Sequence, residues 1–536
     1  MRGSARRTAM PRSKPQDQPA RKRRTATQAA PRFKAVIFLG ASAVSMMVAE
    51  TTGKGNRVVD VLSQPVNLAQ DVFNGGIVTR ETMDRCVQIA QGYTTLLDEY
   101  RKAGEMQVRL LATNILLDVH NMDTLVNRLQ ISCGLELEVM DDGEMTRLLY
   151  LSMQEVLEHD AELQGQRVLV LHVGPGNTRL LLFDKGRISY YASYRMGAHR
   201  TGISIARQDS DTADECSRIR EHIRGNLEQI FYDIEPVLQE PPDALVVFGP
   251  DFHRLQSPLA GGTVTEESLE RLAGEIAETP ASQRMERYRE DYAAMPAVLP
   301  TVVICLSIIR GLEPARIICP GDASSQLAFL ANLMPSQQDD VALEEEVAHF
   351  SMLLANRYRV DRAHSQHIRR LSMALFDQLK ELHGLSRHDR LLLKVACILH
   401  EVGSYISPKN HHHHSQYIIL NSEIFGLSRR DVEIVGLLAR YHRHGAPTTH
   451  DHGYSELDLD NRLRVQKLAA ILRVAEAMER AHSHRITRFS TAINGRRLEI
   501  RIPGIHDLAL ENSALRSKGA MFTDIFGYDI ILVPGE

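Results

Sequence analysis

The pattern of hydrophobic and polar positions predicts two similar α/β halves in the first two thirds of the chain. Residues 35–49, AVIFLGASAVSMMVA, hold two apolar runs around the turn Gly40-Ala41-Ser42, and we expect a β-hairpin there. Residues 168–183 repeat this arrangement around a second glycine turn. Helical periodicity alternates with short apolar runs after each hairpin, which is typical of an α/β fold. The pattern predicts helices over 77–104, 121–132, 142–157 and 211–237, and strands over 108–113, 135–140 and 243–249.

From about residue 340 the pattern changes to helices only. Apolar residues recur at three- and four-residue spacing, first at Leu371, Leu375, Leu379 and Leu382, then at Leu392, Val395 and Leu399. The final fifty residues alternate like strands and predict a small sheet. We therefore expect an α/β region followed by an all-α region and a small C-terminal α+β region, with boundaries at 1–33, 34–157, 158–335, 340–482 and 483–536.

Composition excludes a mostly disordered protein, because 43% of the 536 residues are hydrophobic. The 63 Lys and Arg nearly balance the 67 Asp and Glu, so the chain as a whole has no charge preference for nucleic acid or membrane. Residues 1–34 differ, with eleven basic residues and one acid, and we expect a disordered basic arm. This arm is either a solubilising tail or a weak polyanion-binding segment.

The apolar run 35–49 is superficially similar to a secretion signal, but it is too short to span a bilayer and follows an unusually long basic region. The six cysteines are scattered and none forms a close pair, which argues against a disulfide framework or a zinc knuckle. A cytoplasmic location without membrane attachment is therefore the simplest expectation.

Two halves with glycine-tipped hairpins suit a cleft that binds phosphates, because tight glycine turns expose backbone N–H groups to anions. Some of these residues also have a plain structural explanation, since turns need glycine for backbone reasons alone. The candidate phosphate-binding residues are Gly40, Ser42, Thr113, Gly174, Gly176, Asn177 and Thr178.

Five stretches in this order, ATNILLDVHN, SYRMG, LHEVG, HHHHSQYII and ARYHR, carry a resemblance over residues 34–536. The sequence resembles the exopolyphosphatase and guanosine pentaphosphate phosphohydrolase (Ppx/GppA) family. The resemblance implies an actin-like, sugar-kinase-like fold of two lobes, followed by a helical module related to HD phosphohydrolases. It also implies hydrolysis of terminal phosphates of polyphosphate or pppGpp with magnesium, and a possible homodimer.

The sequence departs from this family at the positions that would hold magnesium and phosphate. Phe38 and His172 stand where the resemblance implies acids, Arg179 replaces a glutamate, and Leu117 replaces an arginine. Met145 aligns with the general base, so Glu144 is the remaining catalytic candidate, and the stretch Ala323–Leu327 replaces a further motif. Since losing a general base alone typically costs about 10²–10⁴-fold in rate, we expect this half to have lost family-type hydrolysis.

The helical region offers a candidate metal site at His364, His400, Glu401 and Glu476, as the resemblance to HD phosphohydrolases implies. Carboxylates and imidazoles suit magnesium, manganese or iron. The alternative is a vestigial site whose histidines only hydrogen-bond one another. The nearby basic residues His414, Arg440, His442 and Arg443 are candidates for contact with a polyanion.

Three functions remain open from the sequence. The first is a working phosphoanhydride hydrolase, as family membership alone implies. The second is a pseudoenzyme that binds polyphosphate or (p)ppGpp without hydrolysing it, or that docks to a partner. The third is a metal-dependent phosphohydrolase that works through the helical region.

Overall fold

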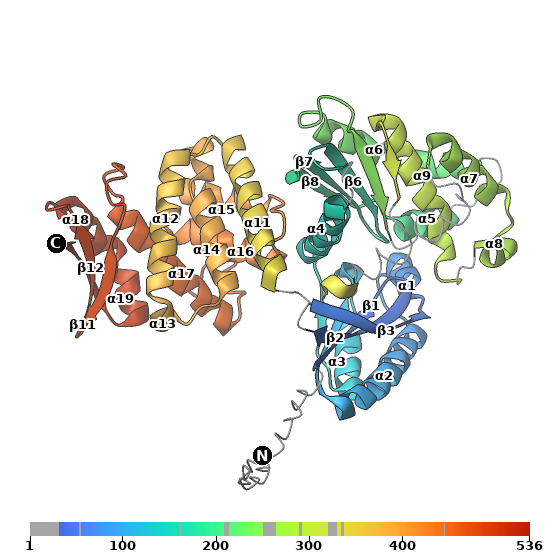
Figure 1. The fold of residues 1–536 in the computed structure, drawn as a ribbon, viewed down its shortest axis with the longest axis horizontal. Coiled ribbons are helices and arrows are strands. Elements are labelled where there is room, and N and C mark those ends of the chain that lie inside the picture. Colours follow the sequence, from blue (N-terminus) through green and yellow to red (C-terminus); the bar gives the residue numbers. More distant parts are fainter. Residues whose placement is uncertain are drawn as a thin grey trace, which may run out of the picture.

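The computed structural model describes residues 32–52, 55–159, 163–207, 214–249, 264–288, 292–319, 330–333, 337–443 and 445–535. Two α/β lobes lie beside a helical body, which ends in a small sheet at the C-terminus (Figure 1). The expected basic arm up to residue 31 and the stretch Ala323–Leu327 lie outside the described residues.

Lobe I is built on a five-stranded sheet in the order β3-β2-β1-β4-β5. The predicted hairpin at 35–49 is confirmed, since β1 and β2 pair antiparallel with Ile37 opposite Met46. β4 pairs parallel to β1 on its other side. The strands are β1 (Arg32–Leu39), β2 (Ala43–Thr52), β3 (Gly55–Pro65), β4 (Glu105–Ala112) and β5 (Leu137–Val139), and the helices are α1 (Leu68–Gly75), α2 (Arg80–Ala103), η1 (Asn114–Asp118) and α3 (Met122–Cys133).

Lobe II repeats the design, with the sheet order β10-β9-β6-β7-β8. In each lobe, three antiparallel strands are followed by one that pairs parallel to the first strand and by another that pairs parallel to that one, which confirms the predicted similarity of the two halves. α4 (Asp142–His159) precedes this lobe. The strands are β6 (Arg167–Val173), β7 (Thr178–Asp184), β8 (Arg187–Tyr194), β9 (Ala244–Phe248) and β10 (Ile317–Ile318), and the helices are α5 (Ala198–Ala206), α6 (Glu215–Ile234), α7 (Glu266–Glu278), α8 (Ala281–Tyr288) and α9 (Met295–Leu312).

α9 is the one helix among the described residues that is long and apolar enough to cross a membrane. Most of it is buried, because it packs against α5, α6 and α7 in the core of lobe II. The apolar surface of α9 is therefore accounted for by packing inside the protein.

The all-helical region predicted from about residue 340 is confirmed. Its helices begin at polar caps, such as Asp361 before α12 and the capping boxes of Ser386 and Ser428 before α14 and α16. The helices are α11 (Gln337–Arg357), α12 (Arg362–Gln378), α13 (Lys380–His383), α14 (Arg387–Leu399), η3 (Val402–Tyr405), α15 (His411–Leu420), α16 (Arg429–Tyr441) and α17 (Leu459–Met478).

The C-terminal residues form the predicted small sheet, in the order β11-β12-β13. Two helices lie against α17, so this region continues the helical body. The elements are β11 (Ser490–Asn494), β12 (Arg497–Pro503), α18 (Ala509–Lys518), α19 (Ala520–Phe526) and β13 (Asp529–Gly535).

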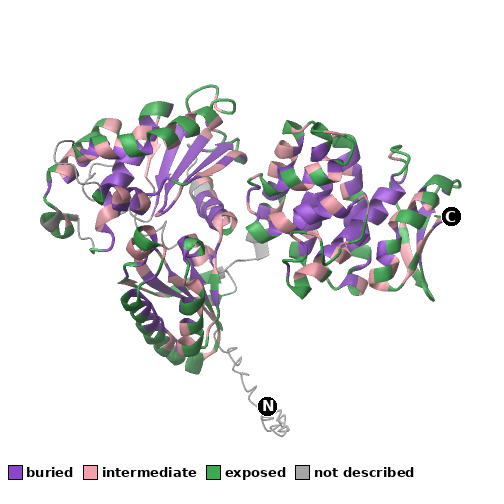
Figure 2. Cartoon of the chain, turned by 180° about the vertical axis from the view of Figure 1, so that it is seen from behind, coloured by how far each residue is buried: buried purple, intermediate pink, exposed green. Residues whose placement is uncertain are grey.

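A continuous buried core joins the helical domain to the outer face of lobe II, and the purple segments in Figure 2 show the buried interior of each part. Phe425 is fully buried there, with its ring 5.3 Å from that of Tyr150 and 6.2 Å from that of Tyr191. Beside it, Gly143 at the start of α4 approaches so closely that a Cβ atom would lie 1.9 Å from the carbonyl oxygen of Leu427. The loop between α15 and α16 is thereby held against the junction of the two lobes.

Candidate functional site

A cavity of about 430 Å³ lies where the two lobes meet the helical domain. Its walls come from η1 and the start of α4 on one side, from the β6–β7 turn and α5 on the other, and from the α15–α16 loop. All three parts of the molecule contribute polar side chains to this interlobe cavity, among them Asn114, Asp142, Asn177, Arg200, Glu423 and Arg429.

Asp142 is the most heavily hydrogen-bonded side chain of the cavity. Asn114 donates to its Oδ1 at 2.6 Å and Asn177 donates to its Oδ2 at 2.9 Å. Ser193 donates to Oδ2 at 3.2 Å, and the buried guanidinium of Arg179 forms an ion pair with Oδ1. Both carboxylate oxygens are therefore engaged by protein donors.

Three arginines line the cavity, together with the acids Asp118, Asp141, Asp142 and Glu423. Arg195 and Arg200 share the carboxylate of Asp118, at 2.9 Å and 3.4 Å. Arg429 begins α16, and its side chain is exposed. Since one acid holds two arginines, this edge keeps a surplus of positive charge suited to a phosphorylated ligand.

Glu423 brings a carboxylate from the helical domain into the same cavity. Desolvation and the negative charge of Asp142 raise its pKa to about 7, against the opposing effects of the Ser193 backbone N–H and of Arg179. Glu423 therefore changes charge near neutral pH.

A second polar centre lies inside the helical domain, where the predicted metal ligands come together. Ligand atoms of His364, His400 and Glu401 lie within 4.8 Å of one another. Oε1 of Glu476 lies 2.9 Å from Nε2 of His400 and 3.6 Å from Nε2 of His364. These nitrogens and Oε1 are buried and have no aligned hydrogen-bond partner in the described part of the chain.

Three histidines of this centre are oriented by backbone carbonyls three residues earlier. Nδ1 of His400 faces Cys397 O at 2.9 Å, Nδ1 of His442 faces Ala439 O at 2.6 Å, and Nδ1 of His411 faces Pro408 O at 3.2 Å. Where Nδ1 of a neutral ring donates to its carbonyl, Nε2 keeps a lone pair, which is the tautomer of a metal-bound histidine. Nε2 of His411 and Nε2 of His442 lie 3.2 Å apart, and since Arg443 lies 3.4 Å from Nδ1 of His411, the His411 ring can carry its proton on Nε2 and donate to His442.

The charges of this histidine centre also fit a cation. Although burial opposes it, contact with His364, His400 and Lys518 holds the pKa of Glu476 well below its usual range. Burial and the charge of His400 keep the pKa of His442 well below its usual value, so this ring is neutral. Lys518 holds Oε2 of Glu476 at 3.2 Å, which leaves Oε1 toward the two histidines. Against the effect of burial, contact with Glu476 raises the pKa of His400, so a divalent cation at this centre would displace the His400 proton from beside Glu476.

Two sequence profiles match the chain. One described as "Ppx/GppA phosphatase family" covers residues 47–324, more than half of the chain, and one described as "Ppx/GppA phosphatase, domain III" covers residues 351–518. The chain belongs to the Ppx/GppA phosphatase family. The family that the sequence motifs indicated is thereby confirmed.

Two relatives share the guanosine-5'-triphosphate,3'-diphosphate pyrophosphatase name. The protein of Pseudoalteromonas translucida is 20% identical over 451 residues, covering 82% of this chain and 86% of its own length. That of Vibrio vulnificus is 22% identical over 450 residues, with the same coverage of 82% and 86%.

Solved structures of similar proteins include an exopolyphosphatase from Cytophaga hutchinsonii, with 14% identity and a TM-score of 0.47 over 56% of this chain and 98% of that one. The Ppx/GppA family member of Aquifex aeolicus has 18% identity and a TM-score of 0.43 over 57% of this chain and 98% of that one. The two-lobed fold of the present chain is shown by its own two five-stranded sheets, whose strand orders match.

The three positions where the Ppx/GppA resemblance implies acids or a glutamate do not fit a cation here. Phe38 lies in β1 between Ser45 and Leu111. His172 and Arg179 face each other across β6 and β7, and both are buried. Burial and Arg179 keep the pKa of His172 well below its usual value, so the ring is neutral. None of these three residues supplies a carboxylate, and both oxygens of Asp142 beside them accept hydrogen bonds.

The predicted phosphate-binding residues divide into two groups. Gly176 and Asn177 line the interlobe cavity, together with Asn114 beside Thr113. The others support the turns. Gly40 and Gly174 donate their backbone N–H groups to Ala43 O and Asn177 O, respectively. Ser42 O accepts from the backbone N–H of Val66, and the Thr178 hydroxyl donates to Met196 O. Thr113 is buried, and its hydroxyl donates to Asn114.

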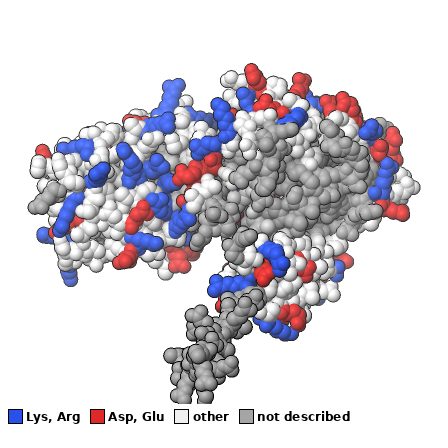
Figure 3. All heavy atoms as spheres, viewed as in Figure 1, with Lys and Arg blue, Asp and Glu red and all other residues white. Residues whose placement is uncertain are grey.

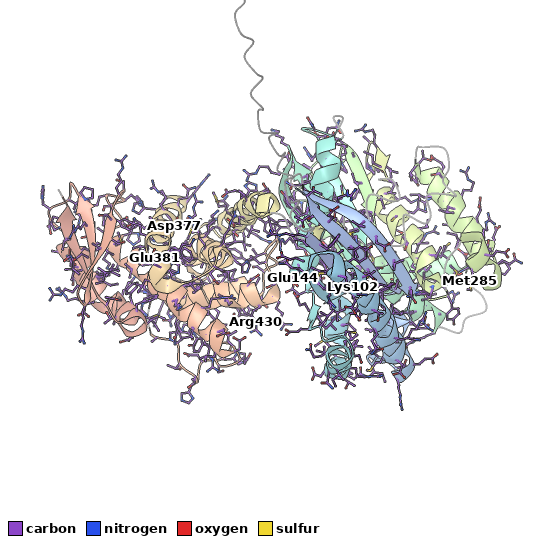
Figure 4. The ribbon with its side chains drawn as sticks, turned by 60° about the horizontal axis from the view of Figure 1, so that its bottom comes forward. Lys102, Glu144, Met285, Asp377, Glu381 and Arg430 are labelled. Atoms are coloured by element: carbon purple, nitrogen blue, oxygen red, sulfur yellow. The ribbon has the colours of Figure 1, made fainter. Side chains whose placement is uncertain are left out.

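Glu144, the catalytic candidate, has a structural role at the start of α4. Its carboxylate accepts the backbone N–H of Asp141 at 3.0 Å, while Asp141 accepts that of Glu144 at 3.0 Å. This reciprocal pair is a capping box. Glu144 lies near the boundary with the helical domain (Figure 4) and lines a smaller cavity with Arg109, separate from the interlobe cavity.

The four residues predicted to contact a polyanion do not form one group either. His442 is buried in the histidine centre, and Arg443 lies 3.4 Å from Nδ1 of His411. Arg440 is paired with Asp451 at 3.0 Å, and His414 is half-buried on α15. On the face in Figure 3, basic side chains are interspersed with acidic ones.

Sequence reasoning missed several contributors to these sites. Asp142 stands two residues before Glu144 in the stretch DDGEMTRLL, and an acid at the start of a helix was the available signal. His411 was considered only as one member of the histidine run. Glu423 and Lys518 carry no local signal, because their places depend on how distant elements pack.

Proposed function

We propose that this chain binds a phosphoanhydride, of the guanosine polyphosphate or polyphosphate type named for its relatives, in the interlobe cavity without hydrolysing it there. The Asp142–Arg179 ion pair carries this proposal, because it gives Asp142, on the cavity wall, a buried protein cation as its partner. A cation placed beside Arg179 would meet a like charge in a partly buried site.

The positive edge of the cavity is the part that recognises phosphate. Arg195 and Arg200 lie on one wall and Arg429 on the wall formed by the helical domain. Their guanidinium groups match phosphate oxygens in pairs. A phosphate chain replaces Asp118 as the partner of these arginines. Gly176 and Asn177 line the cavity beside it.

Calorimetric titration with tripolyphosphate and with pppGpp tests this proposal. Arg195→Ala removes one charge-assisted hydrogen bond of about 1.5–3 kcal/mol, so affinity falls at least about ten-fold. Arg101→Ala is the matched control, because Arg101 is also exposed and paired with one aspartate, Asp98, but lies on α2. Magnesium-dependent phosphate release that disappears in Glu144→Ala, or an affinity unchanged by Arg195→Ala, contradicts the proposal.

A second candidate function is metal-dependent phosphohydrolysis at the histidine centre. The observation that favours it is that Nδ1 of His400, His411 and His442 each faces a backbone carbonyl, so that Nε2 of each ring can turn to a metal beside the carboxylate of Glu476. A bound divalent cation supplies a nucleophilic water near neutral pH. His364 and His400 would hold it with Glu476, and Arg443 can donate to a phosphate at this edge.

His400→Ala decides this second candidate. Metal content of the purified protein and phosphate release from polyphosphate and pppGpp are measured together. Loss of both in His400→Ala, with binding of tripolyphosphate in the interlobe cavity retained, supports hydrolysis in the helical domain. If the wild-type protein takes up no metal and releases no phosphate, this second candidate function is wrong. The interlobe cavity is then the functional site.

A further inference from the structure

A second cluster of possible ligands lies one helical turn beyond the histidine centre. α12 places His367 three residues after His364, and Glu479 follows α17 three residues after Glu476. Residues three apart share a helix face. His484, from the segment that follows, completes the cluster, and its ligand atom lies within 4.8 Å of the other two.

The two oxygens of Glu479 are divided between two imidazole rings. Oε2 lies 2.9 Å from Nε2 of His367, and Oε1 lies 3.3 Å from Nδ1 of His484. Both nitrogens are buried and lack an aligned hydrogen-bond partner over the described ranges. Only 1% of the His367 and Glu479 side chains is exposed, so water does not compensate them.

The backbone is bent to bring His484 to this place. His482 and His484 both have left-handed conformations, with φ of 47° and 54°. Residues other than glycine rarely adopt this conformation, and such strain is typical of functional sites. It sets the ring of His484 5.0 Å from that of His367, and the backbone N–H of His484 donates to Glu479 at 2.7 Å.

We propose that His367, Glu479 and His484 form a second divalent-cation site of the helical domain, which takes Zn²⁺ or a cation of similar softness. Two imidazoles and one carboxylate form a donor set of three protein ligands with one open position. At about 2.0–2.1 Å from a tetrahedral zinc, ligand atoms lie about 3.3–3.4 Å apart, close to the separations seen around Glu479. This assignment does not depend on the proposed function.

A cavity of about 310 Å³ adjoins the cluster and is lined by His367, Arg370 and Arg488. It provides a path for the cation and space for water or an anion at the open position. Since the cation would join α12 to the segment after α17, its binding also stabilises the folded domain.

Arg370 competes with the cation for His367. Its guanidinium lies 3.1 Å from Nδ1, and because arginine only donates, this contact places the ring proton on Nε2. A cation on Nε2 requires that proton on Nδ1, so Arg370, which is exposed, must turn away. Removing Arg370 should therefore strengthen cation binding.

The test is equilibrium dialysis of metal-free full-length protein against Zn²⁺. His400→Ala, which disables the histidine centre, should retain one tightly bound zinc per chain, and adding Glu479→Gln should remove it. In the His400→Ala background, Zn²⁺ should raise the unfolding temperature, and Glu479→Gln should abolish that rise.

Arg370→Ala supplies a test that does not alter the ligands. It should tighten zinc binding by the His400→Ala chain several-fold, while Arg362→Ala, an exposed arginine on the first turn of the same helix, leaves it unchanged. An unchanged zinc count after Glu479→Gln overturns the assignment. So does zinc binding that Arg370→Ala weakens or leaves unaltered.

Discussion

At the residue scale, Asp142 and Arg179 set the charge of the interlobe cavity. Arg179 is almost fully buried, and a buried charge is tolerated only with a close partner. Asp142 supplies that partner and is held in turn by Asn114, Asn177 and Ser193. The carboxylate of Asp142 is therefore paired with a positive charge that belongs to the fold.

Glu423 predicts a pH dependence of anion binding. As pH rises through about 7, this carboxyl ionises and adds negative charge to the cavity beside Asp142, Arg179 and Asp233. One charge at several ångströms from a phosphate contributes about 1 kcal/mol, so tripolyphosphate affinity should fall about five-fold more between pH 6 and pH 8 in wild type than in Glu423→Gln.

Tripolyphosphate also changes its own charge between pH 6 and pH 8, but this change affects wild type and Glu423→Gln equally. The difference between the two proteins therefore reports the charge of Glu423 alone. Below pH 6 the two affinities should agree, because Glu423 is then protonated. Calorimetric titration at several pH values measures the difference, and parallel profiles for the two proteins contradict the assigned role.

At the element scale, α15 and α16 link the interlobe cavity to the histidine centre. α15 begins at His411 and ends just before Glu423, while α16 begins at Arg429 and ends just before His442. Ser415 ties α15 to the turn after α14, because its hydroxyl donates to His400 O at 2.7 Å and accepts from Gly403 N at 2.9 Å. Gly403 allows this contact, since a Cβ there would lie 2.1 Å from His411 O.

Ser415→Ala should weaken metal binding at the histidine centre. The change leaves a buried N–H and a buried carbonyl without their partner, at a cost of about 1–3 kcal/mol in the free energy of unfolding. It also loosens His400, and loss of such a supporting contact typically lowers metal affinity about 10–100-fold. Equilibrium dialysis against Mn²⁺ measures the affinity.

Ser351→Ala is the control for this prediction. Ser351 is also fully buried, but its hydroxyl donates at 2.7 Å to Val347 within its own helix, α11. Its removal should lower stability slightly and leave the metal affinity unchanged. Equal affinities in the two variants would show that α15 does not position His400.

The elements that the sequence predicted are those with a complete local pattern. The hairpin β1–β2 has continuous apolar runs around a glycine turn, and α2 and α3 have clear helical periodicity. β3 was missed because it is an edge strand with largely exposed residues, and its pattern is weak. The predicted strand at 135–140 is reduced to the three residues Leu137–Val139.

The site was predicted only as far as each residue's role follows from its neighbours in sequence. His364, His400 and Glu476 follow from helical spacing and motif resemblance, and they do lie together. Glu144 was chosen by position in a motif, but its carboxylate caps α4. Arg179 finds its partner 37 residues away, a contact that depends on the packing of both lobes.

At the scale of the whole molecule, the helical domain forms one wall of the interlobe cavity instead of standing apart from it. Phe425 anchors that wall, with its ring between those of Tyr150 and Tyr191 on the lobe side and Phe350 on α11. Three parts of the chain must therefore pack together before the interlobe cavity is complete.

Phe425→Ala should separate the unfolding of the helical domain from that of the lobes. Removing a fully buried phenylalanine costs about 3–5 kcal/mol, and here the loss falls on the contact between the two parts. Calorimetry should show two transitions in place of one, and tripolyphosphate affinity should drop because Glu423 and Arg429 are no longer held. Phe522→Ala removes an equally buried ring from α19, away from the lobes, so it should lower the unfolding temperature while cavity affinity persists. A single transition with normal affinity in Phe425→Ala would mean that contacts such as Gly143 against Leu427 hold the domains together without this ring.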